Sequence, residues 1–521
     1  MTITTQSTTD VQRKTSSQIS ERAQACIEWL RDYANRRINS RLIDERRCIP
    51  PYIVLDFGNQ GLMAMQVPAS FGGKLELSLY DTLKVQQQIA AIDLTLSFFV
   101  GSNNILGVQP ILKFATPVIQ QRFLPDLAAG RKIASFALTE PKAGSNPLDI
   151  ESTARSIDGG GFILNGTKMW SGSASWSSVM NVFAKQLSPK GISLGHIALC
   201  VPSDLKGIRQ GPEALTTGVR GMVQNSVFFE NVRIEAEQVL GQPGGGFAVA
   251  SDTMTMGRLG VAATCIGGMW RALQLADRYA RRRTIGSAKL IGSDLAAARI
   301  ASMYAATKAA ESLVDKLAQD IDNGVSVPGE AHAAAKALCS EWLWEVVDSA
   351  IQMLGGRGYI ETNYLAQLMR DARITRLFEG PTDTLFIYIG RRVLETASPL
   401  FDYLATHLGA PEIAAALRNQ LDRMREQWQS SFNTAQNICY AAAGEVTALY
   451  IVKACTKERA SLLWLDARIS RAVEGVGQQL SLDRMLPAAI LEEIVSAIGD
   501  IEQAASDEDR FLDSYLKRDF L

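Results

Sequence analysis

Apolar residues recur every three to four positions through most of this chain, a spacing that places them on one face of an α-helix. Six long stretches keep this period, three before residue 135 and three after residue 250. The pattern therefore predicts two helical regions that a segment of another kind separates. The six stretches are Ser17–Ile38, Tyr80–Ile92, Leu96–Phe114, Asp252–Arg283, Ser293–Asp322 and Gly329–Leu354.

Between the two helical regions the pattern changes to short apolar runs. The runs are Phe162–Leu164, Val179–Ala184, His196–Val201 and Val227–Ile234, and glycine-rich turns separate several of them. Short runs bounded by turn residues are typical of strands. We therefore expect a small β-domain in the middle of the chain.

After residue 400 the helical period returns in an alanine-rich segment. Ile413, Leu417 and Leu421 keep it early, and Ile490 and Ile501 belong to a later stretch that keeps it. Two or more further helices are expected here, buried against the rest of the protein by default. The predicted fold class is α+β, mostly α, in which a C-terminal four-helix bundle follows the β-domain. The predicted parts are a disordered tail at 1–16, an N-terminal helical domain at 17–135, the β-domain at 136–243, the bundle at 244–396 and a helical extension at 397–521.

Composition excludes several classes of function. The net charge is -1, so no general attraction to nucleic acid is expected. We expect no membrane span, since no apolar run reaches about 18 residues, and the acids Asp507, Glu508 and Asp509 disfavour membrane contact. Seven scattered cysteines without a CxxC pair predict reduced thiols, and three distant histidines predict no metal site. These features indicate a cytoplasmic protein, or one of the mitochondrial matrix in a eukaryote.

One acid lies where the chain must turn. The stretch Gln352–Leu385 begins with a glycine-rich helix end, QMLGGRGY, and continues through LMRDARI into Phe378-Glu379-Gly380-Pro381. Glycine followed by proline ends a helix, so Glu379 is predicted at a turn. An acid at such a break can project into a cleft, although a turn glutamate without further context is more often a solvated one.

Two blocks in the predicted β-domain carry polar groups suited to a flat cofactor. The first is ALTEPKAGSN at Ala137–Asn146, and the second is NGTKMWSGSA at Asn165–Ala174. Hydroxyl and amide groups can satisfy the carbonyls and ring nitrogens of a flavin without adding charge. No GxGxxG follows a predicted strand, so a nicotinamide dinucleotide site is not indicated.

These blocks, in this order, resemble the acyl-CoA dehydrogenase family over roughly residues 19–394. The resemblance implies FAD as cofactor and Glu379 as the base that removes the α-proton of an acyl thioester. It implies that the β-hydrogen leaves as hydride to flavin N5, giving the trans-2-enoyl thioester. Residues after about 400 lie outside the resemblance.

The resemblance also implies the site residues. Ser145, Arg258 and Gly380 would contact substrate, and Ser145 also lies near cofactor phosphates. A neighbouring subunit would supply part of the cofactor site through Arg282, Thr284, Gln352, Gly355 and Gly356. The cofactor residues of the β-domain would be Leu138, Thr139, Ser145, Trp170, Ser171 and Ser173.

The chain departs from the family pattern at four positions. Gly172 stands where a Ser or Thr usually bonds flavin N5, which leaves Ser171, Ser173 or backbone for that contact. Gly257 stands where some members carry their base, which favours Glu379. Asn146 replaces an Asp, and Ser293 replaces a Gln, which puts one cofactor contact in doubt.

Two alternatives stay open at this point. One is a flavin-dependent monooxygenase of the same fold. Gly172, at the position that usually bonds flavin N5, is compatible with it, and the presence of Glu379 counts against it. The other is a non-catalytic scaffold without flavin. For the dehydrogenase, the expected partners are a thioester of CoA or of a carrier protein, an electron acceptor (electron-transfer flavoprotein or O2) and further copies of the chain in a homodimer or homotetramer.

Overall fold

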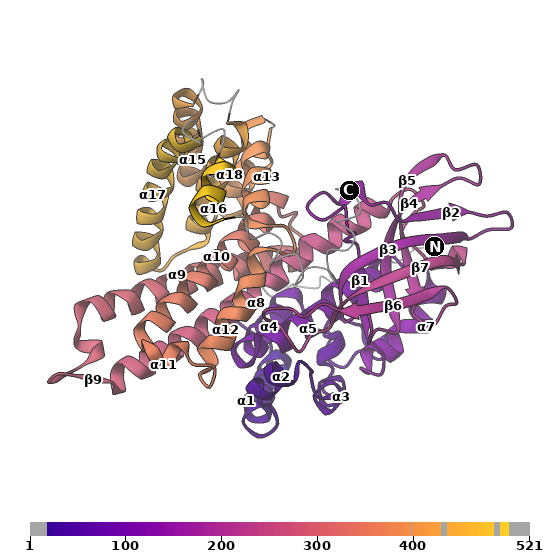
Figure 1. The fold of residues 1–521 in the computed structure, drawn as a ribbon, viewed down its shortest axis with the longest axis horizontal. Coiled ribbons are helices and arrows are strands. Elements are labelled where there is room, and N and C mark those ends of the chain that lie inside the picture. The colour runs from indigo at the N-terminus through magenta and orange to yellow at the C-terminus, as the bar shows by residue number, and fades with distance from the viewer. Residues whose placement is uncertain (1–17, 396, 429–434, 484–489, 500–521) are drawn as a thin grey trace, which may run out of the picture.

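The computed structural model describes residues 18–395, 397–428, 435–483 and 490–499. The mixed sheet lies at one end of the molecule beside the helices, and a further helical layer lies on the bundle (Figure 1). The predicted fold class, mostly helical with a β-domain in the middle, is confirmed. The expected tail at 1–16, Ile501 and the acids 507–509 lie outside the described residues.

The N-terminal helices enclose a core of their own. Helix α1 begins after Ser20, whose side chain accepts a hydrogen bond from the backbone amide of Ala23. The predicted helix Leu96–Phe114 is interrupted by a π-helical turn, in which the buried Asn103 and Asn104 bond backbone groups of neighbouring segments. The helices are α1 (Glu21–Arg37), α2 (Ser40–Arg46), α3 (Pro51–Asn59), α4 (Leu79–Ile92), α5 (Leu94–Gly101), the π-helix η3 (Ser102–Val108), α6 (Gln109–Phe114) and α7 (Pro117–Ala128), with short 3₁₀ turns η1 (Leu62–Ala64) and η2 (Ala69–Phe71).

The middle of the chain forms a sheet with the order β6-β7-β3-β2-β4-β5-β8, to which β1 adds by pairing with β4. Strand β3 is longer than the apolar run predicted, because it continues through the NGTKMWSG block to Gly172 and bulges between Lys168 and Ser171. The strands are β1 (Ala134–Ala137), β2 (Thr153–Ser156), β3 (Phe162–Gly172), β4 (Val179–Leu187), β5 (Ser193–Pro202), β6 (Ile208–Glu213), β7 (Gln224–Ile234) and β8 (Val239–Leu240), with 3₁₀ turns η4 (Pro147–Asp149) and η5 (Ala236–Gln238).

The C-terminal bundle is built around α8, which packs on α4, α9 and α10 and carries small or apolar residues on its buried face. All three long helices predicted in this region are present. The bundle elements are α8 (Gly246–Arg282), the hairpin β9 (Thr284–Ile285) and β10 (Ala288–Lys289), η6 (Leu290–Gly292), α9 (Asp294–Asp322), α10 (Gly329–Leu354), α11 (Gly356–Tyr359), α12 (Tyr364–Arg373), η7 (Ile374–Arg376) and α13 (Thr382–Glu395).

The extension folds back onto the bundle through α16, which crosses α13 at very close range. A Cβ on Gly390 would lie 1.9 Å from the carbonyl oxygen of Tyr440, and one on Gly444 would lie 1.9 Å from that of Phe386. Among the described residues, α16 is the one helix with the length and apolar composition of a membrane span, and it is mostly buried in the protein. The elements are α14 (Leu400–Asp402), the π-helix η8 (Tyr403–His407), α15 (Pro411–Gln427), α16 (Gln436–Cys455), α17 (Arg459–Asp483) and α18 (Ile490–Ile498).

Candidate active site

Glu379 lies in the turn between η7 and α13, as the Gly-Pro pair predicts. Its backbone is left-handed, with φ of 53°, and Gly380 follows with φ of 95°. A residue with a Cβ pays about 1–3 kcal/mol for such a conformation, so neighbouring contacts must hold it there. Glu379 is partly buried, and its Oε2 atom is buried without a hydrogen-bond partner in the described chain. The turn therefore presents one free carboxylate oxygen inside the protein.

Lys336 provides one of the contacts that hold the turn. It lies on α10 with its side chain buried, and its Nζ donates to the carbonyl oxygen of Gly380 at 2.5 Å. Burial lowers the pKa of Lys336 to about 8, while the nearby Glu379 carboxylate acts in the opposite direction. Lys336 is not among the predicted site residues, and its one signal in the sequence is a lysine among apolar residues of a predicted helix.

The electrostatic surroundings of Glu379 favour its neutral form. Burial raises the pKa of Glu379, and the positive charges of Arg258 and Lys336 partly oppose that rise. Among the described residues neither cation forms an ion pair with Glu379 within 4.0 Å. Arg258 also keeps a buried Nε without a partner, and burial lowers its pKa. A carboxyl group in this environment is suited to accept a proton near neutral pH.

Gly257 on α8 faces the same point in space. A Cβ at that position would lie 3.2 Å from Glu379 Oε2 and 3.2 Å from Leu106 Cδ2. The two positions that could carry a base, one on the turn and one on α8, therefore converge. In this chain the helix position is empty and the turn position carries the acid.

The two blocks of the β-domain are joined by a buried ion pair. Lys168 Nζ lies 2.6 Å from Glu140 Oε1 and donates to the carbonyl oxygen of Leu138 at 3.0 Å. The amide of Met169 donates to the carbonyl oxygen of Thr139 at 3.0 Å. Burial lowers the pKa of Lys168 to about 8, although Glu140 opposes this, and the Lys168 charge helps to keep the pKa of Glu140 below its usual value. This pair brings Leu138 and Thr139 beside the strand that carries Trp170.

The end of β3 presents an aromatic surface next to an unpaired hydroxyl. Trp170 has 57% of its surface exposed and a left-handed φ of 51°. Ser171 is buried, and its hydroxyl has no partner in the described chain. Ser173 is buried with φ of 57°, and its amide donates to the Val223 carbonyl oxygen at 2.7 Å. An exposed indole beside unused hydrogen-bonding groups suits the ring of a flavin.

Packing around Gly172 explains why this position has no side chain. A Cβ there would lie 2.6 Å from Met222 Cε and 3.3 Å from Gln224 Nε2, so a larger side chain requires Met222 to move. Local sequence patterns do not reveal this contact, because Met222 is about fifty residues away. Near Gly172 the chain therefore offers the hydroxyls of Ser171 and Ser173 and backbone groups as hydrogen-bonding groups.

A separate cavity of about 630 Å³ joins the end of α8 to the end of α10. Gln352, Gly355 and Gly356 line it, as does Ser293. The predicted Arg282 and Thr284 are exposed beside it and do not line it, and Lys289 Nζ donates to the Thr284 hydroxyl at 2.9 Å. Three arginines that sequence analysis did not select also line the cavity, namely Arg283, Arg299 and Arg357. Guanidinium groups at a glycine-rich helix end suit a pyrophosphate.

The remaining predicted residues lie as follows. Ser145 is exposed at the end of the ALTEPKAGSN block, and Asn146 caps the short turn η4 by accepting from the amide of Leu148. Arg258 is one residue beyond Gly257 on α8, close enough to act on the pKa of Glu379. The structure therefore brings Glu379, Gly380 and Arg258 together at one point.

An unpaired carboxyl group in the bundle and a surface suited to a flavin ring in the sheet define the class as a flavin-dependent oxidoreductase. Within this class, the chain belongs to the acyl-CoA dehydrogenase family. The models of its N-terminal, middle and C-terminal domains match residues 20–131, 135–232 and 244–394. Members of this family use FAD and oxidise CH–CH bonds.

Two relatives show the extent of the similarity. The short-chain specific acyl-CoA dehydrogenase of Homo sapiens mitochondria is 33% identical over 387 residues, which cover 73% of this chain and 92% of the relative. The very long-chain specific enzyme of Mus musculus mitochondria is 32% identical over 336 residues, which cover 63% of this chain and 51% of the relative.

Solved structures agree on the fold. Butyryl-CoA dehydrogenase from Megasphaera elsdenii superimposes with a TM-score of 0.69 at 26% identity, covering 73% of this chain and 99% of that one. An acyl-CoA dehydrogenase complexed with FAD from Bacillus anthracis has a TM-score of 0.73 at 20% identity and covers 93% of this chain and 92% of that one. Because the second superposition covers 93% of this chain, the agreement in fold includes residues after 395.

Proposed function

We propose that this protein catalyses the FAD-dependent α,β-dehydrogenation of an acyl thioester to the trans-2-enoyl thioester. The observation that supports this most is the Glu379 carboxyl group, which is held in a strained turn with Oε2 buried and unpartnered. Its pKa is raised by burial, as a base that works near neutral pH requires. The relatives that carry the name acyl-CoA dehydrogenase support the same reaction class.

In this proposal Glu379 accepts the α-proton of the substrate at its carboxylate. Gly257 places no side chain against Oε2, where even a Cβ would lie 3.2 Å from that oxygen. Proton removal builds negative charge on the thioester oxygen, which needs hydrogen-bond donors. Backbone amides of the turn, including Gly380, and the charge of Arg258 are the groups of this chain available for that task. Bound FAD supplies the acceptor for the β-hydrogen.

The cofactor would be held by two copies of the chain. Leu138, Thr139, Ser145, Trp170, Ser171 and Ser173 would hold the flavin half from one copy. Arg282, Thr284, Gln352, Gly355 and Gly356 would hold the nucleotide half from the other. Gly257 and Arg282 are 25 residues apart on α8, which is about 38 Å at 1.5 Å per residue. Figure 1 shows the β9 hairpin and the sheet at opposite ends of the molecule, which supports a homodimer or a homotetramer.

The substitution Glu379→Gln tests the proposal. It keeps the shape of the side chain and removes the base, so turnover should fall at least about a hundredfold. FAD should stay bound, which the flavin absorbance of the purified protein checks. Glu213→Gln, at an exposed residue of β6, is the control and should leave turnover unchanged.

Two results would contradict the assignment. Retained turnover in Glu379→Gln would remove Glu379 from the chemistry. Purification of the unaltered protein without FAD would favour a scaffold. The thioester carrier, CoA or a carrier protein, and the electron acceptor, electron-transfer flavoprotein or O2, belong to the proposal and are compared by assaying each in turn.

A further inference from the structure

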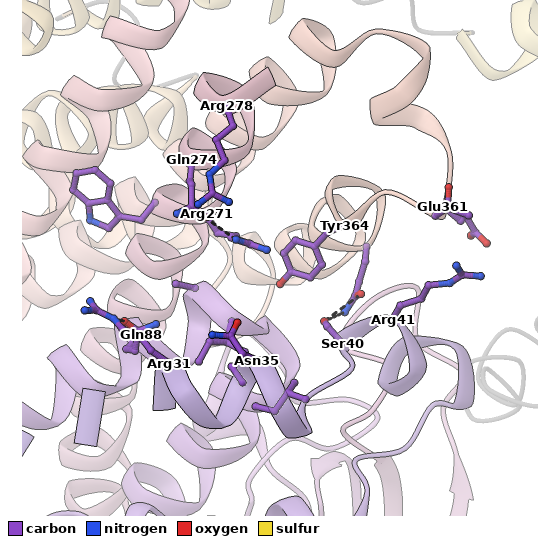
Figure 2. Close-up of a pocket in the computed structure, with 17 residues that line it drawn as sticks. Arg31, Asn35, Ser40, Arg41, Gln88, Arg271, Gln274, Arg278, Glu361 and Tyr364 are labelled. Atoms are coloured by element: carbon purple, nitrogen blue, oxygen red, sulfur yellow. Dashed lines mark hydrogen bonds between the residues drawn. The ribbon is translucent and has the colours of Figure 1, made fainter. Parts of the chain in front are cut away.

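A cavity of about 700 Å³ lies between the N-terminal helices and the bundle (Figure 2), and none of the predicted flavin-binding residues of the β-domain lines it. Residues of α1, α2 and α4 form one wall, and residues of α8 and α12 form the other. We call it the arginine cavity, because Arg31, Arg41, Arg271 and Arg278 line it. It shares no lining residue with the cavity at the end of α10.

The positive charge of this cavity is poorly compensated from within the described chain. Arg31 and Arg271 bond only neutral amides, Gln88 at 2.8 Å and Gln274 at 2.6 Å, which leaves their charges unneutralised. The Nε of Arg271 is buried and has no acceptor. Arg278 forms no hydrogen bond or ion pair with a described residue.

Two carboxylates limit this charge only partly. Glu45 pairs with Arg41 at 2.5 Å, so Arg41 is compensated locally. Glu361 lines the cavity, but its side chain is 81% exposed and its ion pair is with Arg370 at 3.6 Å. Three guanidinium groups therefore face a space of about 700 Å³ without a carboxylate of their own.

Aromatic side chains add a second feature. Tyr364 lies in the wall with its ring 5.6 Å from the Arg271 guanidinium, and Trp270 lines the same cavity. Flat rings beside guanidinium groups suit a ligand that joins an aromatic ring to phosphate. The volume falls within the range of small-molecule sites, about 300–1,000 Å³.

We propose that the arginine cavity binds a phosphate-bearing small molecule of nucleotide size, separately from the catalytic turn. Arg271 follows Gly257 by 14 residues on α8, which places it about 21 Å along the helix from the position beside Glu379. A ligand here contacts both the N-terminal helices and α8. It would therefore bridge the two helical regions without touching the reacting atoms.

Calorimetric titration of the FAD-loaded protein with ADP, and with adenosine as the uncharged counterpart, tests this. ADP should bind at one site per chain beyond the FAD, adenosine should bind at least tenfold more weakly, and salt should weaken ADP binding. Arg278→Gln should weaken ADP binding at least tenfold. Arg46→Gln is the matched control, since Arg46 is exposed on α2 and does not line the cavity.

Three outcomes would overturn the proposal: unchanged ADP affinity in Arg278→Gln, equal binding of adenosine and ADP, or loss of binding in Arg357→Gln but not in Arg278→Gln. The last would assign the ligand to the cavity at the end of α10. The readout is independent of turnover, so failure here leaves the proposed reaction standing.

Discussion

At the scale of single residues, Glu379 depends on two neighbours that act on it in different ways. Lys336 bonds the carbonyl oxygen of Gly380, and Gly257 packs close to Oε2 without a side chain. Arg258 and Lys336 both add positive charge that limits the rise in the pKa of Glu379. The position and the protonation of the acid are therefore set by residues of two helices, α8 and α10, and by the turn itself.

The dependence of turnover on pH should report the ionisation of Glu379. Because burial raises the pKa of Glu379 above 4.5, its base form is lost as pH falls through that raised value. The rate constant for substrate capture, kcat/KM, should rise with pH along one limb and reach a plateau. A limb centred at or below 4.5 would contradict a buried base, and persistence of the limb in Glu379→Gln would assign it to another group.

The substitution Lys336→Met tests whether Lys336 positions Glu379 and sets its charge, or only stabilises the fold. The substitution removes the hydrogen bond to Gly380 and a positive charge near Glu379, so kcat should fall by about ten- to a hundredfold. Loss of the charge should also move the acidic limb of the pH profile to higher pH, which a merely structural residue would not do.

The control for Lys336→Met is Lys308→Met, because Lys308 on α9 pairs with Glu311 and does not act on the pKa of Glu379. The pH limb should stay in place in that variant. An unmoved limb in Lys336→Met would show that Lys336 does not set the charge of the base.

Sequence was sufficient to predict that Glu379 lies in a turn, since Gly-Pro ends the preceding helix. It was insufficient for Lys336 and Met222, because both act across long sequence distances. Lys336 is 43 residues before Glu379, and Met222 lies beside Gly172 from the segment just before β7. Such contacts depend on how helices and strands pack, which local patterns do not specify.

At the scale of elements, the close crossing of α13 and α16 links the extension to the turn that carries Glu379. Helix α13 begins at Thr382, three residues after Glu379. Gly390 and Gly444 lie where the backbones meet, so neither position has room for a side chain. A shift of α16 would therefore displace the helix that fixes one end of the turn.

Gly444→Ala should lower the melting temperature, because its Cβ would meet the Phe386 carbonyl at 1.9 Å and force the helices apart. We expect a loss of about 1–3 kcal/mol in the free energy of unfolding. Gly475→Ala on α17 is the matched control: a Cβ there meets nothing within 4 Å, and helix propensity favours alanine. Equal melting temperatures for the two variants would contradict this account of the crossing.

The helical period located the long helices well and their interruptions poorly. The predicted Leu96–Phe114 contains a π-helical turn, because Asn103 and Asn104 bond backbone groups outside the helix. Strand β3 extends eight residues past the apolar run, to Gly172, because β7 pairs with its polar half. In both cases tertiary hydrogen bonds decide what the local apolar pattern leaves undefined.

At the scale of the whole molecule, the flavin surface and the cavity at the end of α10 lie far apart in one chain. The sequence predicted both sets of residues as parts of one cofactor site, and the fold shows how far α8 separates them within one chain. The extension adds a layer on the bundle side (Figure 1). It contributes no residue to the cavity at the end of α10, and none of the predicted flavin-binding residues belongs to it.

The most direct test of the central claim is an anaerobic titration of the purified protein with a panel of acyl-CoAs, followed by flavin absorbance. The proposed reaction predicts that one or more of them bleaches the flavin in the unaltered protein and that none does so in Glu379→Gln. If no acyl thioester bleaches a fully FAD-loaded protein, whether on CoA or on a carrier domain, the proposed dehydrogenation is wrong.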